Sequence, residues 1–424
     1  MAHVAREMER QEFRLPLLIG GATTSRAHTA VKIAPGYSGP VVYVPDASRS
    51  VPAVQNLLSR EARDGYLETV RADYTKIRAQ HAEKKGPGPL HPIAEARARG
   101  LQTDWTSYRP PVPKRLGIER LADYPLERLI PYIDWSPFFQ AWELSGPYPK
   151  ILDDAIVGEQ ARRLLAEARQ MLERIVREKW IRAAGVCGIF PAAQIHGDDV
   201  EIYADESRSA IRMTLHSLRQ QNHKPAGRPN LCLADFVAPK DSGALDYVGA
   251  FAVCAGGFDE RVEAFEAAHD DYSAIMLKVL ADRLAEAFAE HLHERVRREF
   301  WGYASDERLV NEELLAEGYR GIRPAPGYPA CPDHTTKGPL FALLDAERNT
   351  GMRLTESYAM LPASAVSGFY FSHPQSSYFA VGKIGRDQVE DYARRKGAAF
   401  EEVERWLAPN LGYEPADIIR QTSR

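Results

Sequence analysis

Cysteine is scarce in this chain of 424 residues. The four cysteines, Cys187, Cys232, Cys254 and Cys331, include no Cys-x-x-Cys pair. The spacing therefore supports neither a zinc knuckle nor a thioredoxin-type redox pair. Buried free thiols in a reducing compartment are the favoured interpretation.

Long apolar runs and an excess of positive charge are lacking as well. Runs such as Leu15–Ile19 and Ala250–Ala255 are far shorter than the roughly 20 residues of a membrane-spanning helix. The first 14 residues are charged throughout and contain no apolar segment of a secretory signal. With 54 Lys and Arg against 58 Asp and Glu, the formal net charge is −4, which gives no field to gather nucleic-acid phosphates. We therefore expect a cytoplasmic protein that binds neither membranes nor nucleic acid.

The composition that remains, 44% hydrophobic and 26% charged residues, is that of a globular protein with an ample core. In the first part, strands are predicted over residues 15–19 and 41–44, and helices over 27–33 and 51–58. This is the order of elements in a doubly wound α/β sheet. Because two strands are too few for such a sheet, we interpret this Rossmann-like segment as the end of a domain.

A larger α+β domain is expected after a linker. Residues 71–115 include stiff, polar stretches and are interpreted as a linker that wraps onto the next domain. Beyond it, helices are predicted over 151–180, 262–303, 386–396 and 400–407, and strands over 185–190, 200–203, 231–237, 247–253, 366–372 and 378–384. The last two strands flank a connection of hairpin length, so part of the sheet is expected to be antiparallel.

Two loops have the composition of binding sites. Gly20–Ser25 joins a predicted strand to a predicted helix, where backbone amides can bind an anion, although a glycine pair is also common there for packing alone. Arg323–His334 contains four prolines, which hold an extended backbone and could present Arg323 to a carboxylate. A Pro-rich structural crossover is the equally weighted alternative. Cys331 and His334 have the spacing of half a metal site, but no second half is visible.

The helix predicted around Leu280 carries a row of acids. Its apolar residues recur every four positions, and Asp282, Glu286, Glu290 and Glu294 repeat with the same period, offset by two residues. That offset is roughly 200° around the helix axis. The acids are therefore expected to face solvent. Near the C-terminus, alternation along a strand predicts that Tyr378 and its neighbour point to opposite faces.

Several longer sequence segments resemble the C-terminal portion of cobalamin-dependent methionine synthase. Residues 16–25 and 28–33 resemble the last part of that family's cobalamin-binding domain, and residues 132–135, 234–239, 323–334 and 402–410 resemble its activation domain. The resemblance implies a division into 1–84, the end of the cobalamin-binding domain with a linker, and 85–424, an S-adenosylmethionine-binding activation domain. It also implies an α+β fold with long helices and a mostly antiparallel sheet.

One motif of the family is missing. Its cobalt is held from below by a histidine in a D-x-H-x-x-G motif, and none of the 12 histidines here follows an Asp by two residues. The homocysteine and folate modules, with their thiolate zinc site, are absent too. The chain is therefore expected to be a fragment, a truncated gene product or a separately encoded reactivation subunit.

The resemblance also implies a chemistry. Cobalt(I) that has oxidised to inactive cobalt(II) is restored to methylcobalamin by an electron and by the methyl group of S-adenosylmethionine. The electron donor is expected to be a flavodoxin-like protein or a diflavin reductase, and the remaining methionine synthase modules, acting in trans, are a second candidate partner. The family is a methyltransferase of methionine biosynthesis, whereas this chain alone is not expected to turn over homocysteine.

Site residues are implied in the same way, with no catalytic side chain and no metal ligand among them. Asp134 matches the acid that receives the α-amino group of S-adenosylmethionine, and Arg323 the residue that fixes its methionyl end. The remaining matches are the R-x-x-x-G-Y residues Gly327 and Tyr328 (Tyr328 close to the corrin), the adenosyl-contacting pair Tyr378 and Phe379, the acid Glu286, and Gly20, Gly21 and Ala47 at the cobalamin nucleotide tail.

The favoured hypothesis is a reactivation module that supports the reductive methylation of cobalamin. The alternative is a regulatory module that binds S-adenosylmethionine without corrin chemistry. A generic α+β protein without a ligand is the third, and the presence of Asp134 and Arg323 argues against it.

Overall fold

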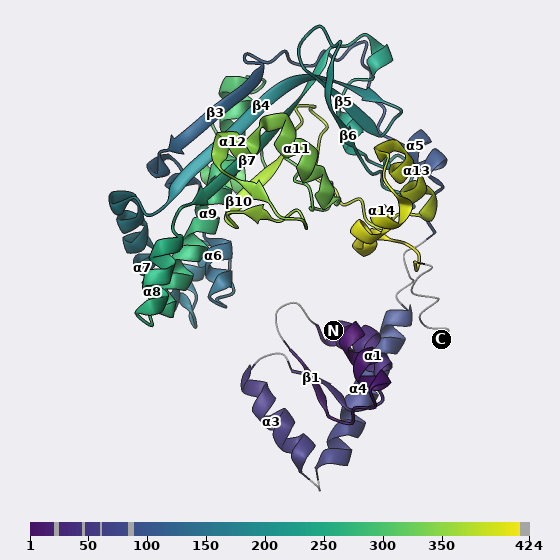
Figure 1. Cartoon of the computed structure of the whole chain (residues 1–424), viewed down its shortest axis with the longest axis vertical. Coiled ribbons are helices and arrows are strands. Elements are labelled where there is room, and N and C mark those ends of the chain that lie inside the picture. The colour runs from purple at the N-terminus through teal and green to yellow at the C-terminus, as the bar shows by residue number, and fades with distance from the viewer. Residues whose placement is uncertain (21–24, 45–46, 60–61, 84–88, 416–424) are drawn as a thin grey trace. The chain divides into compact units, whose positions relative to one another are not determined.

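The computed structural model describes residues 1–20, 25–44, 47–59, 62–83 and 89–415 (Figure 1). It divides into two compact units, residues 1–88 and 89–424, and each is described by itself. The boundary falls four residues after the expected one. Among the described residues, no helix combines the length and the apolar character that a membrane span requires.

The first unit is a small α/β segment. Its parallel strands β1 (Leu17–Ile19) and β2 (Val41–Tyr43) are joined through α2 (Arg26–His28), the π-helical η1 (Thr29–Ile33) and the turn η2 (Ala34–Gly36). Helices α1 (Ala2–Arg10), α3 (Ala47–Leu58) and α4 (Arg63–Glu83) complete it. Both predicted strands are confirmed. The predicted start of the linker is wrong, because α4 continues to Glu83; its many charged residues resemble a polar linker in sequence.

The second unit is built on a six-stranded sheet, and all of its strand pairs are antiparallel. The order is β10-β7-β4-β5-β6, and β3 also pairs with β4. The strands are β3 (Gly117–Tyr124), β4 (Arg182–Ile195), β5 (Asp199–Tyr203), β6 (Ile211–His216), β7 (Asp246–Gly256) and β10 (Ala365–Tyr370). The predicted α+β class is confirmed. Strands β3 and β6 were missed because their exposed positions carry charged residues.

Helices and turns surround this sheet (Figure 1). The helices are α5 (Ile93–Ala98), α6 (Ser136–Ala141), α7 (Gly158–Glu178), α8 (Asp259–Ala267), α9 (Asp271–Arg295), α10 (Asn311–Leu315), α11 (Lys337–Leu344), α12 (Ala346–Thr350), α13 (Arg386–Lys396) and α14 (Phe400–Trp406). Shorter elements are η3 (Leu126–Arg128), η4 (Ile130–Tyr132), η5 (Lys150–Asp153), η6 (Leu233–Phe236), η7 (Lys240–Ser242), η8 (Val296–Phe300), η9 (His334–Thr336), η10 (Ala408–Asn410) and the small pair β8 (Arg353–Leu354) and β9 (Met360–Leu361).

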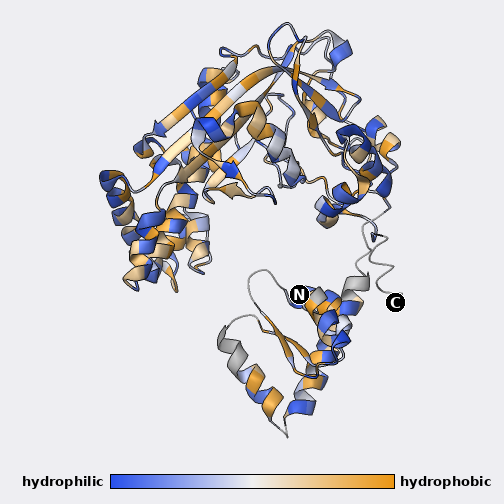
Figure 2. Cartoon of the chain, viewed as in Figure 1, coloured by the Kyte–Doolittle hydropathy of each residue, from blue (hydrophilic) through white to orange (hydrophobic). Residues whose placement is uncertain are grey.

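The central strands are buried on both faces, and Figure 2 shows hydrophobic residues along them. Along β4, Cys187 and Ile189 face the core that helices α6 to α9 cover. Val186 and Phe190 face the opposite core, which α11 and α12 cover. Helix α9 packs closely against β4 because Gly185 has no side chain. A Cβ at Gly185 would lie only 2.9 Å from the Phe288 ring.

Four predicted elements differ from the structure. The helix predicted over 151–180 begins only at Gly158, after a turn in which the Asp154 carboxylate accepts hydrogen bonds from two backbone N–H groups. The helix predicted over 262–303 is interrupted after α8, where His269 has a φ of 57° and Asp270 accepts a hydrogen bond from the Ser273 N–H at 3.0 Å. The strand predicted over 231–237 is the turn η6, in which Asp235 accepts a hydrogen bond from the Cys232 N–H at 3.0 Å. Residues 378–384 form no strand; the segment contacts the Arg323–His334 loop, where the Val381 N–H donates to the Pro329 carbonyl at 2.8 Å. In each case a side-chain cap or a loop contact replaces the regular pattern.

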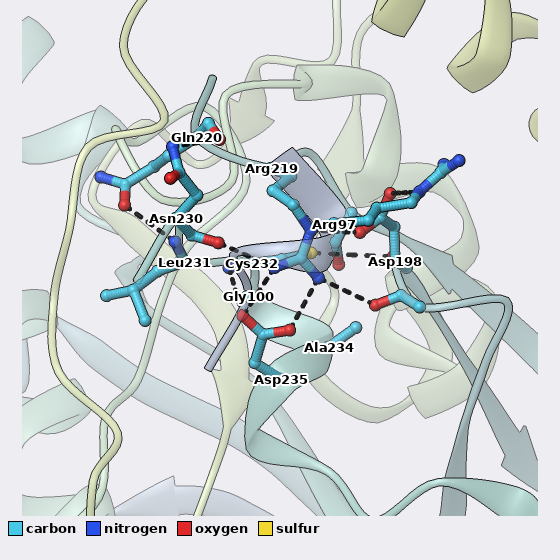
Figure 3. Close-up of polar contacts among 12 residues, drawn as sticks. Arg97, Gly100, Asp198, Arg219, Gln220, Asn230, Leu231, Cys232, Ala234 and Asp235 are labelled. Carbon is cyan, nitrogen blue, oxygen red and sulfur yellow. Dashed lines mark hydrogen bonds and ion pairs between the residues drawn. The ribbon is translucent and has the colours of Figure 1, made fainter. Parts of the chain in front are cut away.

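A buried arginine joins segments that lie far apart in the sequence (Figure 3). The Arg219 side chain is 2% exposed, and its five N–H groups donate to Asp198, to both oxygens of Asp235 and to the carbonyls of Gly197 and Asn230 at 2.7–3.0 Å. Asp198 also accepts a hydrogen bond from Arg97 at 2.6 Å. Every N–H group of the guanidinium has an acceptor, so burial of Arg219 leaves no donor without a hydrogen bond.

The Arg219 network is expected to be essential for stability. Arg219→Ala would leave Asp198 and Asp235 as buried carboxylates without their main partner, and should lower the free energy of unfolding by about 3–5 kcal/mol. Urea unfolding measures this. Arg163→Ala, at an arginine whose side chain is 84% exposed, is the control and should leave stability nearly unchanged. An Arg219→Ala variant as stable as the parent would contradict the analysis.

Candidate functional site

The Arg323–His334 loop lies against the edge of the sheet. The Phe369 N–H of β10 donates to the Pro324 carbonyl at 2.9 Å, and the Gly327 N–H donates to the Cys331 carbonyl at 2.7 Å. With the contact between Val381 and Pro329, these bonds anchor the loop on two sides. The proline-rich segment is thus both a structural crossover and a rigid platform, the two interpretations that the sequence left open.

Gly327 is required by the shape of this loop. Its φ is +95°, and a Cβ built on it would lie 2.3 Å from Cε1 of the His334 ring. The next residue, Tyr328, is 60% exposed. Glycine therefore permits a tight turn that presents a phenol to solvent.

The Arg323 side chain is held by groups from two segments. Its Nη2 donates to Glu290 Oε2 at 2.5 Å, and its Nη1 lies 2.7 Å from the Tyr319 hydroxyl and 3.2 Å from His293 Nδ1. The Arg323 backbone N–H donates to the Tyr378 hydroxyl at 3.0 Å. The structure thus brings Arg323 and Tyr378 together, as the predicted site requires.

Burial and charge set the protonation states in this cluster. Burial, reinforced by Arg297 and Arg323, holds the pKa of His293 well below its usual value, so its ring is neutral. Burial raises the pKa of Glu290, although Arg323 and Arg297 oppose that shift. Burial would lower the pKa of Arg323, but Glu290 and Tyr319 raise it overall. The result is a cationic guanidinium beside one buried carboxyl.

The acidic row on α9 is not solvated along its whole length. Glu286 is exposed, as predicted, but Glu290 is only 4% exposed, which contradicts the prediction. Glu294 is partly buried and accepts hydrogen bonds from Tyr132 and Arg298. Tyr132 and Arg323, which pair with Glu294 and Glu290, belong to other segments, and a helical pattern does not contain such partners.

The two aromatic neighbours point to different surroundings. Tyr378 is 37% exposed, whereas Phe379 packs against the apolar core with its ring centroid 6.4 Å from that of Phe236. The predicted division between opposite faces holds although the segment is not a strand. Tyr378 is therefore the better placed of the two to meet a ligand at Arg323.

Asp134 lies between η4 and α6. Its Oδ1 accepts a hydrogen bond from the Ser136 N–H at 2.9 Å, which fixes the carboxylate. Tyr132, two residues earlier, bonds Glu294, which is one turn along α9 from Glu290. Asp134 thus belongs to a segment held on the same stretch of α9, and its role remains a prediction.

The predicted cobalamin-contacting residues belong to the first unit. Gly20 directly follows β1, and a Cβ there would lie 2.9 Å from the carbonyl oxygen of Val44, the residue after β2. The close approach of this backbone accounts for the glycine. Ala47 begins α3. Gly21 lies outside the described residues.

No set of three or more His, Cys, Asp or Glu side chains in the described ranges could hold a metal ion. Burial raises the pKa of the Cys331 thiol to about 12, so it is not a thiolate. His334 Nδ1 instead lies 3.0 Å from Lys337 Nζ.

Sequence reasoning missed Glu290, His293 and Tyr319 as neighbours of Arg323. Tyr319 lies only four residues before Arg323, but the loop between them has no regular period. Glu290 belonged to the acidic row, and nothing in its spacing distinguishes it from Glu286.

Gly327→Ala is expected to lower the free energy of unfolding. The left-handed backbone conformation alone costs about 1–2 kcal/mol, and the loss should be larger because the new methyl group meets the His334 ring. Gly351→Ala is the matched control: its φ is +80°, and a Cβ there has nothing within 4 Å. The double variant Gly327→Ala/His334→Ala should recover the steric part. Thermal unfolding checks the order, and equal losses for Gly327→Ala and Gly351→Ala would refute the steric argument.

The chain is similar to known proteins. Residues 125–397 match the family model of the vitamin B12-dependent methionine synthase activation domain. A solved crystal structure of the MetH reactivation domain bound to AdoHcy is similar at 57% sequence identity and a TM-score of 0.75. The match covers 77% of this chain and 100% of that one.

Proposed function

The chain belongs to the family of the vitamin B12-dependent methionine synthase activation domain, and from this premise we propose that its second unit binds S-adenosylmethionine at Arg323, Tyr378 and Asp134. The observation that carries the proposal is the partly used guanidinium of Arg323. The AdoHcy bound to the similar reactivation domain supports it.

The charges of the site suit the amino-acid end of the ligand. A guanidinium can hold the α-carboxylate, and the Asp134 carboxylate can hold the α-ammonium group. Among the described residues, Nε of Arg323 has no hydrogen-bond partner. Tyr378 and the exposed Tyr328 offer phenol rings for the remainder of the ligand. Phe379, the neighbour of Tyr378, packs against the apolar core.

We propose that these residues orient the ligand so that its methyl group can restore methylcobalamin in methionine biosynthesis. A sulfonium already carries a reactive methyl group, so the contribution of the chain is positioning. Gly20 has a packing explanation, and no histidine of this sequence has the lower-ligand spacing. The residues described thus do not fit a cobalt ligand, and we assign none to this chain.

The electron is proposed to come from a flavodoxin-like protein or a diflavin reductase, and the remaining methionine synthase modules could act in trans. A regulatory module that binds S-adenosylmethionine without corrin chemistry is the second candidate, and the partly exposed Arg323 and Tyr378 side chains suit it equally. Cytoplasmic location is part of the same proposal.

Calorimetry on chelator-treated protein is expected to show binding of S-adenosylmethionine. Arg323→Ala should weaken binding by about 2–4 kcal/mol, the range for a truncated charge-assisted contact. Arg323→Lys keeps a charge beside Glu290 but loses the planar fork, so it should recover only part of the loss. Asp134→Asn acts on the same amino acid, and the two losses are expected to couple.

Binding of 5′-methylthioadenosine, which has no amino-acid group, is the control for these variants and should not change. Melting temperatures on the same preparations separate lost binding from lost folding. No heat with millimolar S-adenosylmethionine, or an Arg323→Ala variant that binds as well as the parent, would refute the site.

The purified chain is expected to make no methionine from homocysteine and methyltetrahydrofolate, even with cobalamin added. The sequence contains neither the lower-ligand histidine motif nor the thiolate zinc site of the substrate modules. A steady-state assay for methionine tests this, and sustained turnover would contradict it.

A further inference from the structure

Glu290 carries a buried carboxylate with one oxygen unused. The residue is 4% exposed on α9, and its Oε2 accepts the hydrogen bond from Arg323 Nη2 at 2.5 Å. Its Oε1 is buried and has no hydrogen-bond partner within the described ranges. Such a half-used carboxyl gains little as a structural bond, because a buried unpaired oxygen is costly.

The neighbouring charged side chains of α9 and η8 have partners elsewhere, although Nη1 of Arg297 is buried without a hydrogen-bond partner among the described residues. Arg297 donates to Glu307 from Nε at 3.0 Å and from Nη2 at 2.6 Å. Glu294 pairs with Arg298 at 2.5 Å. Within the described part of the chain, Glu290 is thus the one acidic group in contact with Arg323.

The edges of the Arg323 guanidinium are used unequally. Its Nη1 faces the hydroxyl of Tyr319 and the neutral ring of His293, and its Nη2 faces Glu290. Nε makes no hydrogen bond with any residue that the structure describes, and the side chain is 22% exposed. A carboxylate that binds at Nε would therefore meet a cation that already has a counter-ion at Nη2.

We propose that Glu290 is the internal counter-ion of Arg323, a positioning residue that aligns the guanidinium and limits its affinity for the carboxylate of S-adenosylmethionine. The inference rests on the proposed function, since it assumes that this carboxylate binds Arg323. Two carboxylates that share one guanidinium repel each other, so Glu290 weakens ligand binding while its hydrogen bond fixes the plane of the fork.

The weaker ligand binding caused by Glu290 does not slow the methyl transfer. S-adenosylmethionine and its product S-adenosylhomocysteine carry the same carboxylate, so affinity at this group stabilises the bound ligand before and after transfer alike. Binding of that kind does not lower the barrier to the chemical step. A counter-ion that reduces the affinity for this carboxylate shortens the time for which S-adenosylhomocysteine stays bound.

Glu290→Gln tests the proposal, because the amide oxygen still accepts the Nη2 hydrogen bond while the charge is removed. We expect about tenfold tighter binding of both S-adenosylmethionine and S-adenosylhomocysteine, which corresponds to 1.4 kcal/mol. Decarboxylated S-adenosylmethionine, which keeps the sulfonium and the amine, should bind as it does to the parent. Titration calorimetry on the full chain gives all three affinities.

Glu299→Gln is the matched control. It removes the same charge near the end of α9, where Glu299 is exposed and bonded to Arg295 at 2.8 Å. It should change none of the three affinities. Equal or weaker binding of S-adenosylmethionine by a folded Glu290→Gln variant would overturn the proposal, as would equal tightening of the decarboxylated ligand. A parent that binds none of the ligands would instead refute the proposed function, and the inference with it.

Discussion

The close packing of α9 against the centre of the sheet is the constraint from which the site follows. Gly185 on β4 leaves no room for a side chain beneath Phe288, so the helix lies near the strand and its orientation is fixed. Because the apolar stripe of α9 packs into the core, its acidic residues Glu290 and Glu294 lie toward other segments of the chain. Glu290 then meets Arg323, and Glu294 meets the segment before Asp134.

Two partly or wholly buried arginines show how structure and function divide in this fold. Arg219 uses all five N–H groups on protein acceptors, so it has nothing left to offer a ligand. Arg323 is more exposed and has no described partner at Nε. A buried cation that is fully satisfied joins segments, whereas one with a free donor at the surface is available for recognition.

The sequence predicted those elements whose pattern is contained in consecutive residues, and it failed where side-chain caps or contacts with distant segments decide the structure. Strands β1, β2, β4, β5, β7 and β10 and the helix α13 carry their pattern in consecutive residues, and each was found. The turn η6 was read as a strand because its apolar residues are consecutive, although the cap from Asp235 decides its shape. Glu290 was assigned to solvent because its partner lies 33 residues away in the sequence, and no helical period can report a partner on another segment.

The site itself was accessible from the sequence for a different reason. One short segment of the sequence contains Arg323, Gly327 and Tyr328, and the fold requires their spacing. At Gly327 the positive φ and the adjacent His334 ring exclude any side chain. The prolines of the same segment order the backbone without help from Arg323. The turn at Gly327 that presents the Tyr328 phenol depends mainly on residues of this segment, and Phe369 and Val381 anchor it. The electrostatic environment of Arg323 is not so determined, since it comes from α9. The proposed ligand-binding residues were named from the family resemblance of such segments, whereas Glu290, the proposed counter-ion, belongs to no such segment.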